Sequence, residues 1–327
     1  MDNQNTQPAF TKLIDLASDR LGGRVTEASD EFFAEKEGLI KVSAPVYKQD
    51  EFTERGKWMD GWETRRRRSP GHDWCVIQLA VPGVIEGVDV DTSHFVGNHP
   101  PEISIDAAQR AENGDVEWQE IIARTPIEEN AHNYLSVASD ESWTSVRLNI
   151  YPDGGVARFR VYGVVVPDWS SSADVERDVE LSAIRNGGRI VACSDQHFGN
   201  VGNLLLPMAP ENMGDGWETK RRRGPGYDWV VLQLGSVGIL SRVELDTTHF
   251  KGNFPDRCSM EGCRDYNESN PDANHWDEVL PEKRLKPDFK HSFDEFSMAG
   301  PFSHVRLNII PDGGVARLRV FGRRHGK

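Results

Sequence analysis

The sequence lacks the features that mark membrane-bound, secreted and nucleic-acid-binding proteins. It has no apolar run near the roughly 20 residues that a membrane-spanning helix requires, and Met1 to Gln7 have neither the basic start nor the apolar stretch of a secretory signal. Positive charge is scarce, because 38 Lys and Arg residues stand against 52 Asp and Glu residues, a net charge of −14. Polyanion binding depends on a positive surface, so we expect no nucleic-acid partner and no membrane partner.

Cysteines and signature motifs are scarce as well. The four cysteines, at positions 75, 193, 258 and 263, form no Cys-x-x-Cys pair and no regular framework, which predicts a reduced, cytoplasmic location. The sequence has no nucleophile elbow, P-loop, dinucleotide fingerprint or His-Glu-x-x-His motif. Long amphipathic helices, which a parallel α/β fold needs between its strands, are also missing.

What the sequence does contain is an internal duplication. The segment 61–79 recurs 155 residues later at 216–234, with 14 of 19 positions identical. The Asp-Thr-x-His-Phe segment at 91–95 recurs at 246–250, and the block at 146–158 recurs at 305–317. Extra residues in the first copy lie around 48–57. We therefore predict two tandem domains, 1–168 and 169–327, with a linker near 167–173.

The fold prediction depends on short strands. Residues 74–79, 84–90 and 146–150, with their repeats, are apolar or alternate between polar and apolar residues, and turn signals separate them. The Pro-Asp-Gly-Gly segment at 152–155 predicts a hairpin between two adjacent strands. We expect Arg158 and Arg160, and their repeats, on an exposed strand face. The pattern predicts an all-β protein of two jelly-roll β-sandwiches.

Arginines provide the first candidate site. The run at 65–68 and its repeat at 220–223 form either a solvated loop paired with carboxylates or a clamp for a small carboxylate, since guanidinium groups bind carboxylates through two hydrogen bonds. Glu63 and Glu218 adjoin these runs, so we expect their pKa values to be lowered and their carboxylates to accept hydrogen bonds. Arg147 and Arg306 alternate with apolar residues and face either solvent or a site.

Histidine provides the second candidate site. His94 and His249 follow an aspartate by three residues at the end of an apolar strand, so each could be a general base or a metal ligand. The alternative is a capped turn, with aspartate as the cap and histidine packed against phenylalanine. The Asp-x-x-His spacing is a weak metal motif by itself. The sequence therefore indicates no certain cofactor, and a divalent metal is the one candidate.

The paired Gly-Trp-Glu-Thr-(Arg/Lys)-Arg-Arg-Arg-x-Pro-Gly-x-Asp-Trp blocks resemble the allantoicase family, and the other repeated blocks strengthen the resemblance from Leu16 to Arg323. It implies a duplicated jelly roll of the galactose-binding-like kind and amidinohydrolase activity, in which allantoate and water give ureidoglycolate and urea during purine degradation. We also expect a homo-oligomer. The alternatives are a non-catalytic jelly-roll binding protein and a hydrolase of a related ureido acid.

This chemistry needs a group that removes a proton and a group that assists the leaving ureido nitrogen. We predict that the histidines are catalytic and that the preceding aspartates orient them: His94, His249, Asp91 and Asp246. The predicted substrate-binding residues are Glu63, Arg66, Arg67, Asn98, Arg147, Glu218, Arg221, Arg222, Asn253 and Arg306. The sequence leaves open whether each repeat has a site or both share one. The substitutions of His72 by Tyr227 and of His99 by Phe254 indicate that the repeats are not equivalent.

Overall fold

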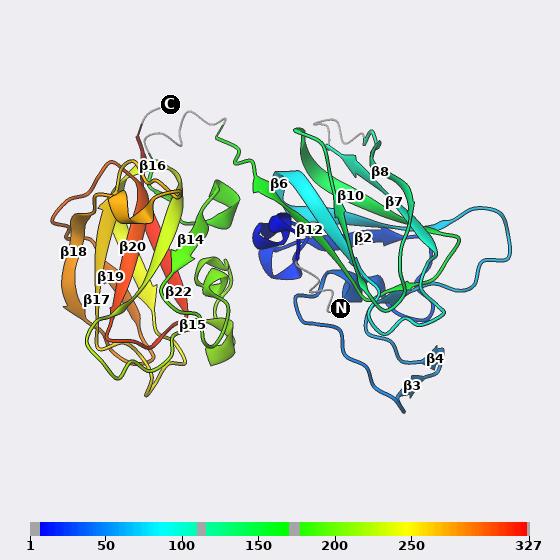
Figure 1. Cartoon of the computed structure of the whole chain (residues 1–327), viewed down its shortest axis with the longest axis horizontal. Helices are drawn as coiled ribbons and strands as arrows, with labels where there is room; N and C mark the ends of the chain where they lie inside the picture. Colours follow the sequence, from blue (N-terminus) through cyan, green and yellow to red (C-terminus); the bar gives the residue numbers. More distant parts are fainter. Residues whose placement is uncertain (1–6, 110–115, 170–176, 326–327) are drawn as a thin grey trace. The chain divides into compact units, whose positions relative to one another are not determined.

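The structure is a computed structural model that describes residues 7–109, 116–169 and 177–325 (Figure 1). It divides into two compact units, Met1–Val166 and Pro167–Lys327. Most of the expected linker and most of the N-terminal segment lie outside the described residues.

The first unit is built around one long, bent strand, β6 (Asp73–Asp91). Its first half pairs with β2 and β10, and its second half pairs with β9 and β12. The sheet order is β1-β12-β6-β10-β7-β8. The remaining elements are η1 (Ala9–Lys12), β1 (Ile14–Asp15), η2 (Asp19–Leu21), β2 (Arg24–Ala28), η3 (Lys36–Ile40), β3 (Phe52–Thr53), β4 (Gly56–Lys57), β5 (Trp62–Glu63), β7 (Glu102–Ala108), β8 (Gln119–Pro126), β9 (His132–Ser136), β10 (Ser142–Tyr151), β11 (Gly155–Val156) and β12 (Arg158–Val165).

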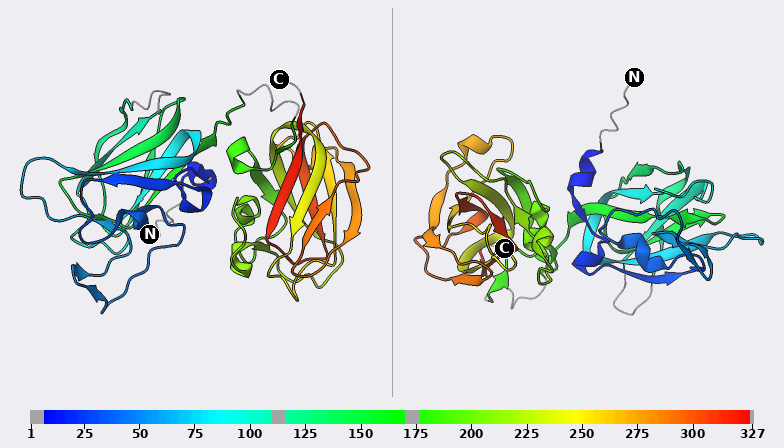
Figure 2. Two further views of the ribbon diagram at one scale, coloured as in Figure 1. Left: turned by 180° about the vertical axis from the view of Figure 1, so that it is seen from behind. Right: turned by 90° about the horizontal axis from the view of Figure 1, so that it is seen from below.

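The second unit repeats this topology around β16 (Asp228–Asp246), with the order β13-β22-β16-β20-β17-β18. Views from behind and from below show the same layered arrangement of strands within each unit (Figure 2). Its other elements are β13 (Val179–Glu180), η5 (Ile184–Asn186), β14 (Arg189–Cys193), η6 (Val201–Leu205), η7 (Met213–Asp215), β15 (Trp217–Glu218), β17 (Arg257–Cys263), η8 (Pro271–Ala273), β18 (Asp277–Arg284), β19 (Lys290–Phe293), β20 (Phe302–Ile310), β21 (Gly314–Val315) and β22 (Arg317–Arg324).

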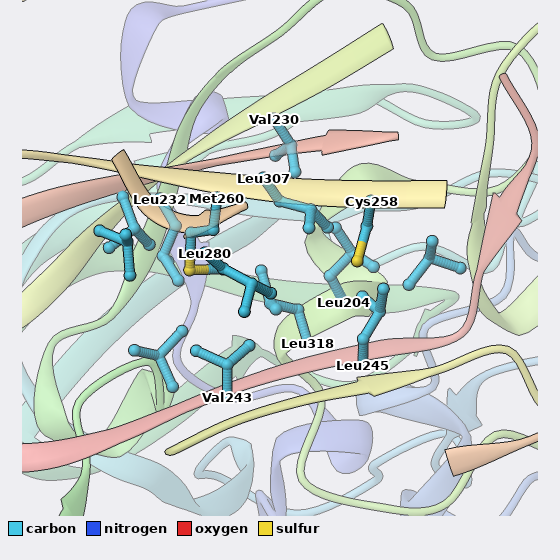
Figure 3. Close-up of a cluster of buried hydrophobic side chains, with 14 of the residues drawn as sticks. Leu204, Val230, Leu232, Val243, Leu245, Cys258, Met260, Leu280, Leu307 and Leu318 are labelled. Carbon is cyan, nitrogen blue, oxygen red and sulfur yellow. The ribbon is translucent and has the colours of Figure 1, made fainter. Parts of the chain in front are cut away.

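Alternating burial along the long strands explains the sandwich. From Asp73 to Ile85 every second residue of β6 is buried, as expected when one face of a strand packs on a core. In the second unit, Val230 and Leu307 face Val243 and Leu318 across the core (Figure 3). Each such buried side chain contributes about 1.5–3 kcal/mol of transfer free energy. The predicted all-β, duplicated jelly-roll fold is confirmed.

The hairpin prediction at 152–155 is wrong. β10 pairs with the first half of β6, whereas β12 pairs with its second half, so the Pro-Asp-Gly-Gly segment crosses between the two layers. Gly154 has φ 142°, a conformation that glycine tolerates, and a Cβ at Gly155 would overlap the ring of Phe95. The glycines therefore serve close packing against the loop that follows β6.

The predicted exposure of Arg158 is wrong too. Arg158 and its repeat, Arg317, are only 1% and 3% exposed. The Arg158 guanidinium donates to the carbonyl oxygens of Ser43 and Asp60 and to the Asp60 carboxylate (2.8 Å). A segment that precedes β5 therefore covers this sheet face, and the buried charge is paired, as a buried arginine requires.

Candidate active site

Most of the predicted site residues gather at one end of each sandwich. In the first repeat, Asp73 and Asp91 lie at opposite ends of β6, yet their strand partners are Ile150 and Arg158, which the short segment 151–157 connects. Both ends of the bent strand therefore reach the same end of the sandwich. The arginine run, Asp91, His94 and Asn98 all lie on the loops there.

A pocket of about 410 Å³ lies beside His94. Its lining side chains are Tyr47, Lys57, Met59, His94, Val96, Asn98 and Asn130. Lys57 supplies positive charge, and its Nζ lies 2.5 Å from the Tyr47 hydroxyl. The two asparagines supply amide donors and acceptors. Such a pocket suits a small polar anion.

The backbone and ring of His94 are both held in place. Its φ is 70°, an uncommon value for a residue other than glycine, and its backbone N–H donates to the Asn130 side-chain oxygen (2.9 Å). Its Nε2 lies 3.3 Å from the carbonyl oxygen of Pro45. Because a carbonyl oxygen can only accept, we assign the proton to Nε2, which leaves the Nδ1 lone pair available as a base.

Glu63 lies behind Asn98, whose Nδ2 donates to Glu63 Oε1 (2.9 Å). Burial raises the pKa of Glu63, although this hydrogen bond opposes the shift. The expected lowering by arginines is therefore wrong. The reason is geometric, because the Arg65 guanidinium pairs with Asp30 and the Arg67 guanidinium pairs with Asp73.

Asp91 is not hydrogen-bonded to His94. Its Oδ1 accepts the backbone N–H of Ser93 (2.8 Å), which caps the turn that carries the histidine. Asp246 accepts the N–H of Thr248 in the same way (2.8 Å). The structure therefore places both aspartates as turn caps near the histidines rather than as direct partners of their rings.

The second repeat keeps part of this arrangement. His249 has φ 73°, its Nε2 lies 3.0 Å from the Pro210 carbonyl oxygen, and Asn253 donates to Glu218 (2.7 Å). The surroundings differ, because Met213 Sδ lies 3.8 Å from Asn253 Nδ2. Lys251 is largely exposed, and its Nζ lies 4.0 Å from a carboxylate oxygen of Asp288.

The arginine runs lie beside the same loops. The backbone N–H groups of Arg67 and Arg222 donate to Asp153 and Asp312, and their guanidinium groups pair with Asp73 and Asp228. Arg66 and Arg221 are exposed. In the second repeat the run lines a pocket of about 420 Å³, which also includes Ser194 and Asp195. The arginines that pair with aspartates fit the interpretation of a loop paired with carboxylates. The exposed arginines fit the interpretation of a clamp for a small carboxylate.

Arg147 and Arg306 belong to a different surface. Arg147 donates through Nε and Nη2 to Asp106 (2.9 and 2.7 Å) and lies over the Trp118 ring. Arg306 pairs with Glu261 and lies over Trp276 in the same manner. These side chains project from the central strands of a sheet, and the pocket beside His94 does not include them.

Sequence reasoning missed Tyr47, Lys57 and Asn130. The first two lie in or next to the segment around 48–57 that only the first repeat contains, so the insertion itself was the available signal. Among the described residues, no group of three or more His, Cys, Asp or Glu side chains has the arrangement of a metal site. No described helix is long and apolar enough to cross a membrane.

The fold and the pocket define a duplicated jelly-roll protein with a small polar site at the loop end of a sandwich. The family model for the allantoicase repeat matches residues 14–166 and 179–325. The chain is 48% identical over 326 residues to probable allantoicase 1 of Burkholderia mallei, with 96% of each chain covered. It is 49% identical over 322 residues to probable allantoicase of Pseudomonas aeruginosa, covering 96% of this chain and 97% of the relative.

Among solved structures, the allantoicase of Saccharomyces cerevisiae superimposes with a TM-score of 0.80 at 39% identity, covering 95% of this chain and 93% of that one. The chain belongs to the allantoicase family.

Proposed function

We propose that the protein hydrolyses allantoate to ureidoglycolate and urea in purine degradation. The observation that carries this proposal is full-length similarity to allantoicases in both repeats. The pocket beside His94 supports it, because allantoate is a small anion with one carboxylate and two ureido groups.

The pocket offers partners for each part of this substrate. Lys57 can hold the carboxylate through charge-assisted hydrogen bonds. The side-chain amides of Asn98 and Asn130 can pair with the ureido groups. A site built from such polar partners strongly rejects analogues that leave them unpaired. We therefore assign substrate binding to the first repeat.

We assign His94 as the general base. Its Nδ1 lone pair takes a proton from water, the water oxygen forms a bond to the central carbon, and the bond from that carbon to one ureido nitrogen breaks. A proton supplied to that nitrogen completes urea. In this mechanism Asp91 holds the turn that presents His94, and Glu63 holds Asn98.

The other predicted residues have supporting roles in the proposal. Arg66 and the rest of the run add positive potential near the pocket of an otherwise acidic protein, which favours encounter with an anion. Asp246, His249 and Asn253 keep the same turn in the second repeat. We also propose a cytoplasmic homo-oligomer, and the four free cysteines accord with a reducing compartment.

The test is incubation of the purified full-length protein with allantoate, with urea and ureidoglycolate both quantified. We expect equimolar formation of the two products. A parallel arm with a chelator measures metal dependence, and an arm with ureidoglycolate as substrate measures the alternative ureido-acid activity. Binding of allantoate without urea release would contradict the proposed hydrolysis and support a binding protein.

A further inference from the structure

We infer that Asp89 and His132 of the first repeat form a second proton-transfer pair, in which the protonated imidazole gives its Nε2 proton to the leaving ureido nitrogen. This inference rests on the proposed hydrolysis of allantoate and supplies the acid that the reaction needs besides a base. Neither residue belongs to a repeated motif.

The geometry of the pair is that of a buried carboxylate holding an accessible imidazole. Asp89 is 3% exposed, and its Oδ2 lies 2.8 Å from His132 Nδ1. Its second oxygen, Oδ1, is buried without a hydrogen-bond partner among the described residues. The His132 side chain is 49% exposed, and its Nε2 makes no hydrogen bond within the described part of the chain. An aspartate that fixes one ring nitrogen leaves the other for proton transfer.

The charges around His132 favour the protonated ring. Asp91, on the same strand as Asp89, places Oδ2 at 4.0 Å from His132 Nδ1. The opposing cation is Arg160 of β12, which is itself paired with Asp15 of β1. Burial opposes protonation, but the hydrogen bond and charge of Asp89, together with the charge of Asp91, raise the pKa of His132.

Two tyrosines complete the surroundings of the pair. The Tyr134 ring of β9 stacks on His132 at 5.7 Å between centroids. Tyr162 of β12 adjoins Asp89 and Arg160, and burial together with the charges of Asp15 and Asp89 raises its pKa. Burial raises the pKa of Tyr134 as well, so both phenols are neutral near pH 7. Burial also raises the pKa of Asp89, and the hydrogen bond and charge of His132 oppose that shift.

The pair lies next to the loops of the pocket. His132 is opposite Asp91 in the strand register, and Asp91 precedes His94 by three residues. Asn130, two residues before His132, lines the pocket and binds the His94 backbone. His132 itself does not line the pocket, so the link between the proposed base and the proposed acid is the loop that carries Asn130.

The second repeat shows that the fold does not need this pair. Glu244 takes the position of Asp89 and pairs with Arg242, while Lys290 takes the register position of His132. The neighbouring buried pair of Arg158 with Asp60 is kept as Arg317 with Asp215. Lys290 Nζ lies 4.0 Å from Asp246, so the second repeat keeps a cation beside this aspartate. It does not keep a carboxylate hydrogen-bonded to an imidazole at this position, which a purely structural role would favour.

The pair completes the hydrolysis without another reactant. One proton leaves water for His94, the hydroxyl bonds to the central carbon, and the carbon–nitrogen bond breaks with its electrons remaining on nitrogen. The Nε2 proton of His132 moves to that nitrogen and releases urea. The proton taken by His94 then returns to His132 through solvent, so the enzyme is restored.

The test compares urea release by the full-length wild type, His132→Gln, His132→Lys and Asp89→Asn, with Lys290→Gln as the matched control. We expect His132→Gln to lower kcat by about 100-fold or more, the range for loss of an acid–base group, with little change in KM. Asp89→Asn should move the alkaline limb of the kcat profile to lower pH, because it removes a charge that raises the pKa of His132. Lys290→Gln should retain kcat.

Circular dichroism and thermal unfolding check that each variant is folded. If His132→Gln fails to fold, His132→Lys takes its place in the test, because the second repeat accommodates lysine at this register position. Wild-type kcat and an unchanged alkaline limb in a folded His132 variant would overturn the pair alone. Absence of urea release from the wild type would overturn the proposed function and the pair together.

Discussion

The two repeats share a polar framework but differ in the groups placed on it. Both copies bury an arginine that donates to three backbone carbonyl oxygens and a carboxylate, Arg158 with Asp60 and Arg317 with Asp215. Both hold a histidine in the left-handed region and direct its Nε2 at a proline carbonyl oxygen. These shared contacts fix the loop end of the sandwich.

The two repeats differ in the side chains that are placed to contact a ligand. Only the first repeat has the insertion that places Lys57 in the pocket with His94. Within the described residues, the Asp89–His132 pair also occurs in the first repeat alone. The duplication therefore separates residues that maintain the fold from residues that a site requires. For a position that occurs in both repeats, the same substitution in the other repeat serves as a control.

The largest expected effect tests the shared framework. Arg158→Leu and Arg317→Leu should each destabilise their own repeat by about 3–5 kcal/mol, because each leaves a buried carboxylate without its partner. Denaturant unfolding combined with peptide-resolved hydrogen exchange measures each repeat separately. The exposed Arg68→Leu is the control. A loss below about 1 kcal/mol in one repeat only would show that the two frameworks are not equivalent.

The next test addresses the histidines. His94→Asn should lower kcat by about 100-fold or more, whereas His249→Asn should change it less than about threefold, because we place the base in the first repeat. Asparagine is chosen because it tolerates positive φ and so keeps the turn. Steady-state urea release measures both variants. Equal losses of kcat in the two variants would indicate a working site in each repeat. Undiminished turnover in both variants would exclude histidine catalysis at these positions.

Substitution of Lys57 tests whether the insertion in the first repeat contributes to substrate binding. Lys57→Gln should raise KM for allantoate about tenfold with kcat nearly unchanged, since one charge-assisted hydrogen bond contributes about 1.5–3 kcal/mol in the bound state and glutamine keeps part of it. Lys251→Gln removes the lysine two residues after His249 in the second repeat and should leave KM unchanged. An effect of Lys251 equal to that of Lys57 would place substrate binding in both repeats.

The sequence was most informative where it was duplicated. The repeated Trp-Glu-Thr-(Arg/Lys) block identified the arginine loop. Alternation along 73–85 identified a strand with one buried face. Alternation does not specify which strand pairs with which, so the segment around Gly154 was taken for a hairpin although it joins two layers. Burial of Arg158 was also unpredictable, because its partners at Ser43 and Asp60 lie about a hundred residues away.

The site was least predictable where the repeats differ. Lys57 and His132 have no repeated counterpart, so no motif singled them out. The pKa of Glu63 depended on where the neighbouring guanidinium groups point, and adjacency in sequence does not determine that direction. Such features follow from tertiary contacts of single residues and require the structure.

The smallest expected effect concerns a substitution that sequence comparison had already noted, His72 against Tyr227. His72 Nε2 lies 3.3 Å from Asn149 Oδ1, whereas the corresponding Asn308 Oδ1 is buried without a partner among the described residues. Tyr227→His should therefore stabilise the second repeat by about 1 kcal/mol, the usual net gain from one hydrogen bond. His72→Tyr should destabilise the first repeat by a similar amount.

Peptide-resolved hydrogen exchange on both variants checks the signs of these two changes together. The His72 ring also packs against Tyr151, with 4.6 Å between ring centroids, and this position is Ile310 in the second repeat. The loss in the first repeat should therefore exceed the gain in the second. If Tyr227→His gives no stabilisation while His72→Tyr still destabilises, the ring contact with Tyr151 rather than the hydrogen bond distinguishes the two sheet faces.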